Sequence, residues 1–336
     1  MHRVLLVLPF NERSGACVSA LNLKSLLESK GVTVSIASPE GDCFKQNITI
    51  SKIGYNIFSS LFSAAVLWRC YFKYDTIIFF TIRMALISAF FSRSKKCFLY
   101  LHEVDVQPVF LSLLISRILI KRLIKNVIVV SPFMSKYYGE SVLLLPNVAD
   151  TCRLSDNKDK CIIKDIDYIM IANFRKAKGV YKFRDLANSI PNKRFMLITN
   201  KELADSNELD VYLDCIPLNM SVCFKQDEKN DFLRKSKYLV NLSELNETFG
   251  LTLVEAISVG VIPLCYYREG FAFCLGEKAY FLDEINTVES IVKISNQLDI
   301  NVNYDSYLRQ LIRHVDINFS PTAVMENARA LFKFNF

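Results

Sequence analysis

Short runs of apolar residues, each the length of a single β-strand, recur along this chain. The first lies at residues 3–10 (RVLLVLPF), close to the N-terminus. Such a continuous run is typical of a parallel strand that is buried on both faces. Most of the runs are followed by a segment in which apolar residues have helical spacing. Repeated βα units of this kind predict a doubly wound parallel sheet with helices on both of its faces.

The predicted elements form two successive series. The first contains strands at 3–10, 32–38, 75–81, 97–102, 127–131 and 142–145, and helices at 16–30, 56–72, 84–92, 108–124 and 132–139. The second contains strands at 167–173, 194–199, 220–225, 238–243 and 261–266, and helices at 180–190, 228–236 and 250–259. An irregular acidic stretch is expected between the second and third of these strands. The chain is expected to end in helices near 286–298, 303–314 and 321–334.

The segment between the two series (RLSDNKDKCIIKDID) is charged and has little apolar periodicity, which is typical of a linker. A chain of 336 residues is long enough for two domains. We therefore predict an N-terminal Rossmann-like domain at 1–150, a linker at 151–166 and a C-terminal Rossmann-like domain at 167–310. The C-terminal helix at 311–336 is expected to pack back on the N-terminal domain.

The composition favours a cytoplasmic protein. Although 51% of the residues are hydrophobic and the mean hydropathy is +0.21, no uncharged apolar run reaches about 18 residues, so no spanning helix is predicted. Ten cysteines without a C-x-x-C pair indicate reduced thiols rather than disulfides or zinc ligands. The N-terminus reads as a first strand and lacks the cleavage site of a signal peptide.

The formal net charge of +7 favours an anionic partner, which could be a nucleotide, an acidic membrane surface or nucleic acid. Nucleic acid is the least favoured, because no basic patch is interleaved with aromatic residues. Basic residues lie beside the most apolar helices of the first half: Arg69, Lys73, Arg93, Lys95, Lys96, Lys121 and Arg122. This pattern predicts peripheral contact with anionic lipid at the inner face of the membrane. The alternative is a buried core with a solvated basic rim.

The stretch NETFGLTLVEAISVG (246–260) carries the strongest indication of a ligand site. Gly250 lies at a turn that leads into a helix, and the free N–H groups of the first helical turn can bind an anion. Glu247 stands at the start of this helix. Glu255 follows Leu251 by four residues on the same apolar face, where a carboxylate needs strong hydrogen-bond donors. A phosphorylated sugar would supply the anion for the helix start and the hydroxyl donors for Glu255. The alternative is an ordinary buried helix, in which one glutamate caps the helix and the other has its hydrogen-bond partners within the protein.

Other polar residues follow strands at the carboxyl edge, where open α/β sheets bind their ligands. Ser14 and Gly15 occupy the first strand-to-helix turn, and His102 ends the strand at 97–102. Arg175, Lys176 and Lys178 come just before Gly179, after the first strand of the second series. These cations are suited to clamp a diphosphate, whereas the alternative is a solvated loop.

In this order and spacing, the motifs resemble GT-B glycosyltransferases of the large retaining family 4 group, which includes bacterial lipopolysaccharide and capsule enzymes. The resemblance rests on two glutamates with seven residues between them, Glu247 and Glu255, inside NETFGLTLVEAISVGVIPL. Supporting motifs are LLVLPFNERSGA, VIVVSPFMSKYYG, LLPNVAD and ANFRKAKG. They cover nearly the whole chain and imply two Rossmann-like domains with an interdomain cleft.

The resemblance also implies a role for each residue. Glu255 would bind the ribose of the nucleotide, and Glu247 the donor sugar. Lys178 matches the diphosphate lysine of the family, and His102 matches a donor-sugar histidine found in part of it. Further donor-binding positions are the backbone amides of Phe249, Gly250 and Leu251, the first turn at Ser14 and Gly15, and Asn173. Asn173 stands where the family has an arginine, so Arg175 would take over the role of that arginine.

The implied reaction is retaining transfer of a sugar from a nucleotide sugar to a glycan or lipid-linked acceptor, in cell-surface polysaccharide synthesis. No cofactor or metal is expected, because cations and a helix start can neutralise the departing diphosphate. The only D-x-D pattern, Asp165-Ile166-Asp167, falls in the predicted linker. The alternatives are a sugar-nucleotide epimerase or phosphorylase on the same fold, and an inactive membrane-associated scaffold.

Overall fold

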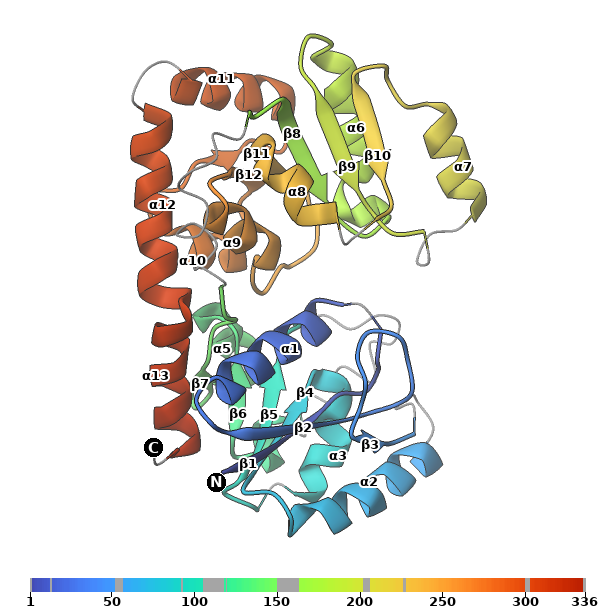
Figure 1. Ribbon diagram of the computed structural model, residues 1–336, viewed down its shortest axis with the longest axis vertical. Coiled ribbons are helices and arrows are strands. Elements are labelled where there is room, and N and C mark those ends of the chain that lie inside the picture. Colours follow the sequence, from blue (N-terminus) through green and yellow to red (C-terminus); the bar gives the residue numbers. More distant parts are fainter. Residues whose placement is uncertain are drawn as a thin grey trace. The chain divides into compact units, whose positions relative to one another are not determined.

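The computed structural model describes residues 2–12, 14–51, 57–91, 93–104, 118, 120–149, 163–201, 206–225, 228–299 and 303–334. The chain divides into two compact units, each with its own sheet (Figure 1). Unit 1 comprises Met1–Val148 and Asn318–Phe336, and unit 2 comprises Ala149–Ile317. Most of the helix predicted at 108–124 and of the linker predicted at 151–166 lies outside the described residues.

Unit 1 contains a sheet of seven parallel strands in the order β3-β2-β1-β4-β5-β6-β7. Its strands are β1 (Arg3–Val7), β2 (Thr33–Ser38), β3 (Ile48–Thr49), β4 (Thr76–Phe80), β5 (Cys97–Leu101), β6 (Val127–Val129) and β7 (Leu143–Leu144). Its helices are α1 (Gly15–Glu28), α2 (Ile57–Tyr71), α3 (Ala85–Phe90), α5 (Ser135–Tyr138) and α13 (Pro321–Phe332), with the 3-10 turns η1 (Ile82–Met84) and η2 (Pro132–Met134). Every residue of β4 and β5 is buried, as continuous apolar runs predict.

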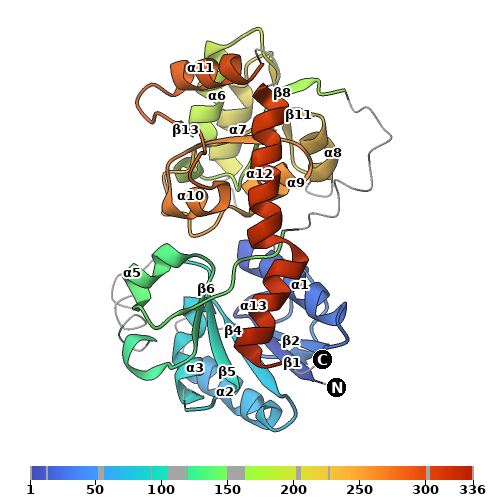
Figure 2. The ribbon, with the colours of Figure 1, turned by 90° about the vertical axis from the view of Figure 1, so that its left-hand side faces the viewer.

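The last helix of the chain belongs to unit 1. α13 packs against α1 (Figure 2). The ring of Phe332, in its last turn, meets the ring of Phe98 on β5 edge to face, with the ring centroids 5.0 Å apart. Phe334 follows and lies in the same way against His2, just before β1. These aromatic contacts hold the C-terminal residues to β5 and to the residue that precedes β1.

Unit 2 contains a second sheet of parallel strands, in the order β10-β9-β8-β11-β12-β13. Its strands are β8 (Ile166–Ile171), β9 (Phe195–Ile198), β10 (Met220–Cys223), β11 (Ser236–Asn241), β12 (Ile262–Tyr266) and β13 (Phe281–Leu282). Its helical elements are η4 (Lys176–Lys178), α6 (Val180–Ser189), α7 (Ser206–Asp214), α8 (Lys229–Arg234), α9 (Leu251–Ser258), α10 (Glu269–Leu275), α11 (Thr287–Asp299) and α12 (Asn303–Phe319). The predicted α/β class with two doubly wound parallel sheets is confirmed.

Buried tyrosines tie the helices of unit 2 to its sheet. Tyr168 on β8 and Tyr238 on β11 are both fully buried beneath α11. The Tyr168 hydroxyl lies 2.9 Å from the Ser295 hydroxyl, and the Tyr238 hydroxyl donates to Asp299 at 2.6 Å. Because the buried hydroxyl groups have partners, the large rings can fill the core without an unsatisfied polar atom.

Two helices of unit 2 differ from the expectation. α7 lies in the stretch that was expected to be irregular, and its buried side chains are Leu209 and Tyr212. Two apolar residues among acidic ones do not show a helical periodicity that is clear enough to identify a helix. α10 has only seven residues, and two residues separate it from β12. A helix this short presents too few turns for its apolar residues to show a helical repeat.

Gly179 lets the turn after β8 pass directly over the end of β11. Its φ of +83° lies in the left-handed region that favours glycine. A Cβ atom at this position would lie 2.5 Å from the carbonyl oxygen of Leu242. Two residues after Leu242, the backbone N–H of Glu244 donates to the carbonyl of Ala177 at 2.9 Å. The turn that carries the predicted cations is therefore fixed against the loop that leads to Glu247.

We predict that Gly179→Ala lowers the free energy of unfolding by about 2–4 kcal/mol, because it combines an unfavourable φ with overlap between backbone atoms. Gly260→Ala is the matched control. Its φ is +82°, but the nearest atom to an added Cβ is 3.9 Å away, so it should cost only about 1 kcal/mol. Urea unfolding followed by circular dichroism measures both. Equal costs would contradict the close approach at Gly179.

Candidate functional site

The turn after β8 presents three cations at the carboxyl edge of the unit 2 sheet. Arg175 and Lys176 are exposed, whereas Lys178 is half-buried. They follow Phe174, which is buried against the ring of Tyr212, with the centroids 5.0 Å apart. The apolar residue between Asn173 and Arg175 thus anchors the turn in the core. Asn173 itself is half-buried at the end of the strand.

Lys178 and Glu247 come together, although 68 residues separate them in the sequence. The ammonium nitrogen of Lys178 lies 2.5 Å from a carboxylate oxygen of Glu247. The same oxygen accepts a hydrogen bond of 2.7 Å from the Ser243 hydroxyl. The side chain of Glu247 is 18% exposed and that of Lys178 is 27% exposed, so the pair is shielded yet within reach of a ligand. The sequence alone does not identify Ser243 as a site residue, although it lies only four residues before Glu247 in the chain.

The start of α9 differs in one respect from the predicted anion site. The N–H of Gly250 donates to the sulfur of Cys274 at 3.3 Å, so this group is not free for a phosphate. A Cβ at Gly250 would lie 3.1 Å from the ring of Phe271 and 3.2 Å from the side chain of Leu253. The glycine is therefore explained by packing against α10 rather than by close approach of a ligand. The N–H groups of the first turn that begins at Leu251 have no acceptor within the helix, and they are the donors left for an anion.

The other glutamate of the motif also has a partner in the chain. A carboxylate oxygen of Glu255 lies 2.7 Å from the ammonium nitrogen of Lys229, on α8. Both side chains are partly exposed, at 29% and 21%. The expectation that Glu255 lies on a buried apolar face and needs a ligand for its donors is wrong, because Lys229 supplies one and solvent reaches the group. No local pattern in the sequence links the two residues.

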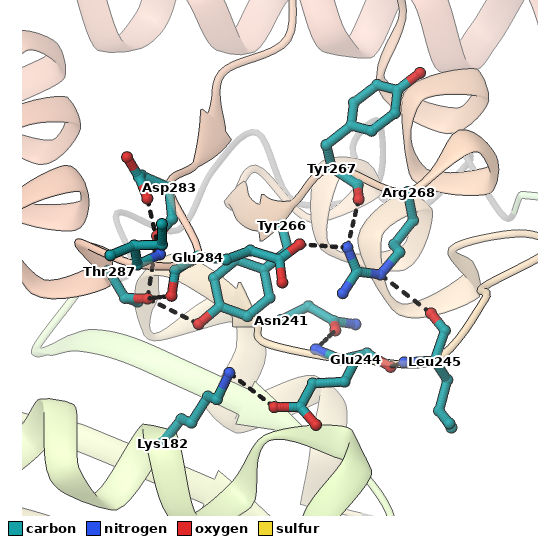
Figure 3. A network of polar contacts seen from close by, with 12 residues as sticks. Lys182, Asn241, Glu244, Leu245, Tyr266, Tyr267, Arg268, Asp283, Glu284 and Thr287 are labelled. Atoms are coloured by element: carbon teal, nitrogen blue, oxygen red, sulfur yellow. Dashed lines mark hydrogen bonds and ion pairs between the residues drawn. The ribbon is translucent and has the colours of Figure 1, made fainter.

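The start of α10 also fixes the Glu247 segment. A Cβ atom at Gly270 would lie 2.2 Å from the carbonyl oxygen of Glu247 and 2.5 Å from the carbonyl carbon of Thr248. Just before it, the Arg268 guanidinium donates to the carbonyl of Leu245 at 3.2 Å and pairs with Glu284 at 2.6 Å (Figure 3). Arg268 was also missed, because its partners come from two other loops.

A further ion pair flanks this loop. Lys182 on α6 lies 2.8 Å from Glu244, and Figure 3 shows the two side chains extending toward each other across the edge of the sheet. The neighbouring lysine is the main reason why the pKa of Glu244 lies below its ordinary value. The carboxyl edge of unit 2 therefore carries alternating cations and carboxylates, most of which are already paired within the chain.

In unit 1, the predicted turn between β1 and α1 has a structural role. The Ser14 hydroxyl accepts a hydrogen bond of 3.3 Å from the N–H of Cys17 and so caps the helix that begins at Gly15. Asn11 holds the adjacent loop through hydrogen bonds with both the backbone N–H and the carbonyl of Phe44. The Ser14 side chain is thus engaged by its own helix, and the N–H groups of the first turn remain the polar feature of this site.

His102 lies at the carboxyl end of β5 in a network of neutral side chains. Its Nε2 is 2.9 Å from the Ser19 hydroxyl, which in turn donates to the side-chain oxygen of Asn147. Because the hydroxyl proton is committed to Asn147, Nε2 must carry a hydrogen and donate to Ser19. The rings of Phe80 and Tyr100 pack against the imidazole, at centroid distances of 5.3 and 4.2 Å. Burial lowers the pKa of His102 to about 4, so the ring is neutral at physiological pH.

The pKa of the next residue, Glu103, is shifted in the opposite direction. Burial raises the pKa of the Glu103 carboxyl to about 7. One carboxylate oxygen of Glu103 accepts a hydrogen bond of 3.2 Å from the N–H of Ile82. This contact lies beside Thr81, whose φ of +73° is a strained conformation for a β-branched residue. The carboxyl edge of unit 1 thus presents a neutral imidazole next to a carboxyl group that titrates near neutrality.

Neither metal clusters nor spanning helices are found in the part of the chain that the structure describes. Within the described residues, no group of three or more His, Cys, Asp or Glu side chains is placed to hold a metal ion. Over the same residues, no helix is long and apolar enough to cross a membrane.

The neutral state of His102 predicts how stability depends on pH. In the unfolded chain this histidine binds a proton below about pH 6.5, whereas in the folded protein it does so only below about pH 4. Between these values the unfolded state binds more protons, so His102 lowers stability progressively as the pH falls from about 6.5 to 4. His102→Gln should remove this part of the pH dependence of urea unfolding. Ser19→Ala, which keeps the imidazole, should retain it; identical pH dependence in wild type and His102→Gln would contradict the assignment.

No family model matches the chain, and no curated protein matches it in sequence. Solved structures do match over nearly its full length. A glycosyltransferase from Rickettsia africae ESF-5 has a TM-score of 0.80 at 13% identity, covering 99% of this chain and 98% of that one. Anabaena HepE in complex with UDP-glucose has a TM-score of 0.78 at 14% identity, covering 99% and 100%. Sucrose-phosphate synthase from Thermosynechococcus elongatus has a TM-score of 0.78 at 12% identity, covering 99% and 98%. Identities this low show a shared fold, and the chain therefore has the GT-B fold, with two Rossmann-like units.

Proposed function

We propose that this protein is a retaining glycosyltransferase, which moves a sugar from a nucleoside diphosphate sugar to a glycan or lipid-linked acceptor. The observation that carries the proposal is the meeting of Lys178 and Glu247 beside the first turn of α9, at the carboxyl edge of unit 2. Open α/β sheets bind ligands at this edge. The UDP-glucose bound to the Anabaena protein of the same fold supports a nucleotide-sugar donor.

The chemistry needed is stabilisation of a departing diphosphate. Lys178 and the exposed Arg175 would supply positive charge, and the N–H groups of the first turn of α9 would bind phosphate oxygens. Glu247 would then accept hydrogen bonds from hydroxyls of the donor sugar. Because Lys178 pairs with Glu247 in the unliganded site, the diphosphate has to compete for the ammonium group. The pair keeps the lysine in place until the donor arrives.

The ribose is assigned to Glu255. A ribose diol would offer two hydroxyl donors to a carboxylate that Lys229 already holds at 2.7 Å. Partial exposure of this pair leaves room for a ligand at its open side. Retention of configuration is expected from attack on the same face that the diphosphate leaves, with a diphosphate oxygen accepting the proton of the acceptor hydroxyl. A role in cell-surface polysaccharide synthesis, in the cytoplasm, fits a glycan or lipid-linked acceptor.

The assignment of the two glutamates can be tested on variants. Glu255→Gln should weaken nucleotide binding by about 1.5–3 kcal/mol, or roughly ten- to a hundredfold, because an amide cannot accept two ribose hydroxyls as a carboxylate does. Glu247→Gln should lower turnover and change the affinity for the free nucleoside diphosphate less than Glu255→Gln does, because Glu247 would touch only the sugar. Isothermal titration calorimetry and initial rates measure the two effects.

Glu244→Gln is the matched control, since it also removes a carboxylate from an ion pair at this edge, and should not affect nucleotide affinity. A purely structural Glu255 would give the reverse result. Its Gln variant would change the melting temperature, by the loss of a partly exposed ion pair worth about 0–1 kcal/mol, while nucleotide affinity stayed at the parent value.

The clamp is predicted to work without a metal. Arg175→Met and Lys178→Met should each reduce donor binding or turnover by about 1–3 kcal/mol, the range for charge-assisted hydrogen bonds. Lys176→Met, in the same turn, is the control and should have little effect. The assay is release of nucleoside diphosphate from a panel of nucleotide sugars, with cell-envelope extract as the acceptor source and with a chelator present.

Product analysis and binding measurements on the same panel of nucleotide sugars separate the proposal from its alternatives. Conversion of the nucleotide sugar without an acceptor would indicate an epimerase, and a lack of any nucleotide-sugar binding would indicate an inactive scaffold. Activity that is abolished by the chelator and restored by manganese would contradict the metal-free clamp.

A further inference from the structure

Helix α2 exposes its more apolar face. Among its described side chains, the buried positions are Ser63, Leu67 and Cys70, two of them small. Its most exposed large side chains are Phe62 (60%) and Trp68 (55%), and Phe72, directly after the helix, is 72% exposed. A helix that packs on a core normally has the opposite pattern, with its apolar stripe inward. The exposed stripe therefore needs an apolar environment that the chain itself does not provide in its described part.

The stripe extends onto the neighbouring helix. α2 and α3 lie next to each other on unit 1 in both views (Figure 1 and Figure 2). The ring of Trp68 lies 6.0 Å from that of Phe91 and 6.1 Å from that of Phe72, which joins the two helices into one aromatic cluster. We define the aromatic surface as the exposed apolar residues of both helices and their ends: Leu61, Phe62, Trp68, Phe72, Leu86 and Phe90.

Cations accompany this surface. Arg69 and Lys73 each directly follow one of its aromatic residues, and both are exposed. The ammonium group of Lys96 lies over the ring of Tyr71 at 3.9 Å from its centroid. Residues 51–139, which contain the aromatic surface, include twelve Lys and Arg but only three Asp and Glu. Their excess of nine positive charges is larger than the net charge of +7 of the whole chain.

We propose that the aromatic surface docks on the interface of a lipid bilayer that contains anionic headgroups. Exposed Trp and Phe with Leu match the boundary between headgroups and acyl chains, and the adjoining cations match anionic phosphates. A second copy of this chain fits less well, because it would bring two equally positive surfaces together. The proposal concerns residues of α2 and α3 in unit 1, whereas the proposed function depends on residues of unit 2, so either can fail without the other.

The chain contains one tryptophan, Trp68, so its fluorescence reports on this surface alone. Mixed with vesicles of equal parts phosphatidylglycerol and phosphatidylcholine, the protein should co-sediment and its emission should shift to the blue. High salt should reverse both effects, because it screens the cations. Vesicles of phosphatidylcholine alone should give neither.

Variants locate the contact. Phe62→Ser with Phe72→Ser should weaken partitioning into the anionic vesicles by about tenfold or more, since both rings leave water on binding. Arg69→Gln with Lys73→Gln should weaken it by a similar factor and reduce the salt dependence. The matched controls are Ile285→Ser with Leu218→Ser, which are exposed apolar residues of unit 2, and Lys30→Gln with Lys278→Gln, which are exposed lysines. Both control pairs should bind like the parent.

Three results would overturn the proposal. One is the absence of binding and of an emission shift with anionic vesicles. Another is binding that survives both pairs of variants, which would place the contact elsewhere. The third is a blue shift that depends on protein concentration without lipid, because a second copy would then cover the surface. Circular dichroism of each variant checks that a loss of binding does not reflect a loss of folding.

Discussion

The candidate site depends on close contact between backbones on both sides of one loop. At Gly179, the turn after β8 touches the end of β11, and at Gly270, α10 begins against the carbonyl of Glu247. At either place a Cβ atom would lie within 2.5 Å of a backbone oxygen. The loop between β11 and α9 is therefore held from two directions, and Glu247 and the start of α9 inherit their positions from it. Such support keeps a binding group within the narrow range of positions that recognition requires.

The charges at this edge are paired in advance. Lys178 contacts Glu247, Lys229 contacts Glu255, and Lys182 contacts Glu244. Each pair is partly exposed, where an ion pair contributes little net stability. A ligand with phosphates and hydroxyls can therefore exchange these contacts for its own at modest cost. The pairing keeps a site with many charges ordered in the absence of a ligand.

The sequence predicts the strands well and the site only in part. Continuous apolar runs identify buried parallel strands, and the order of strands and helices then locates the carboxyl edge of the sheet. Lys178 and Glu247 both fall in the second series of elements, near that edge. Lys229 could not be found in this way, because it lies 26 residues from Glu255 and no local pattern links the two residues. The role of Gly250 was also misjudged, since its packing against α10 depends on a helix too short to recognise.

The pH behaviour of unit 1 lies beyond sequence reasoning for a similar reason. His102 and Glu103 are adjacent in the chain, but burial moves their pKa values in opposite directions, to about 4 and about 7. Both shifts favour the neutral form, since desolvation penalises a charge of either sign. The sequence His102-Glu103 alone does not distinguish this buried pair from two solvated residues at the end of a strand.

We propose above all that the carboxyl edge of unit 2 binds a nucleoside diphosphate. A crystal structure of the protein soaked with nucleoside diphosphates tests it most directly. We expect electron density for the ribose at Glu255 and for the diphosphate between Lys178 and the first turn of α9. The Lys178–Glu247 contact should be lengthened or broken. Density at any other surface, or an unchanged Lys178–Glu247 pair beside a bound nucleotide, would contradict it.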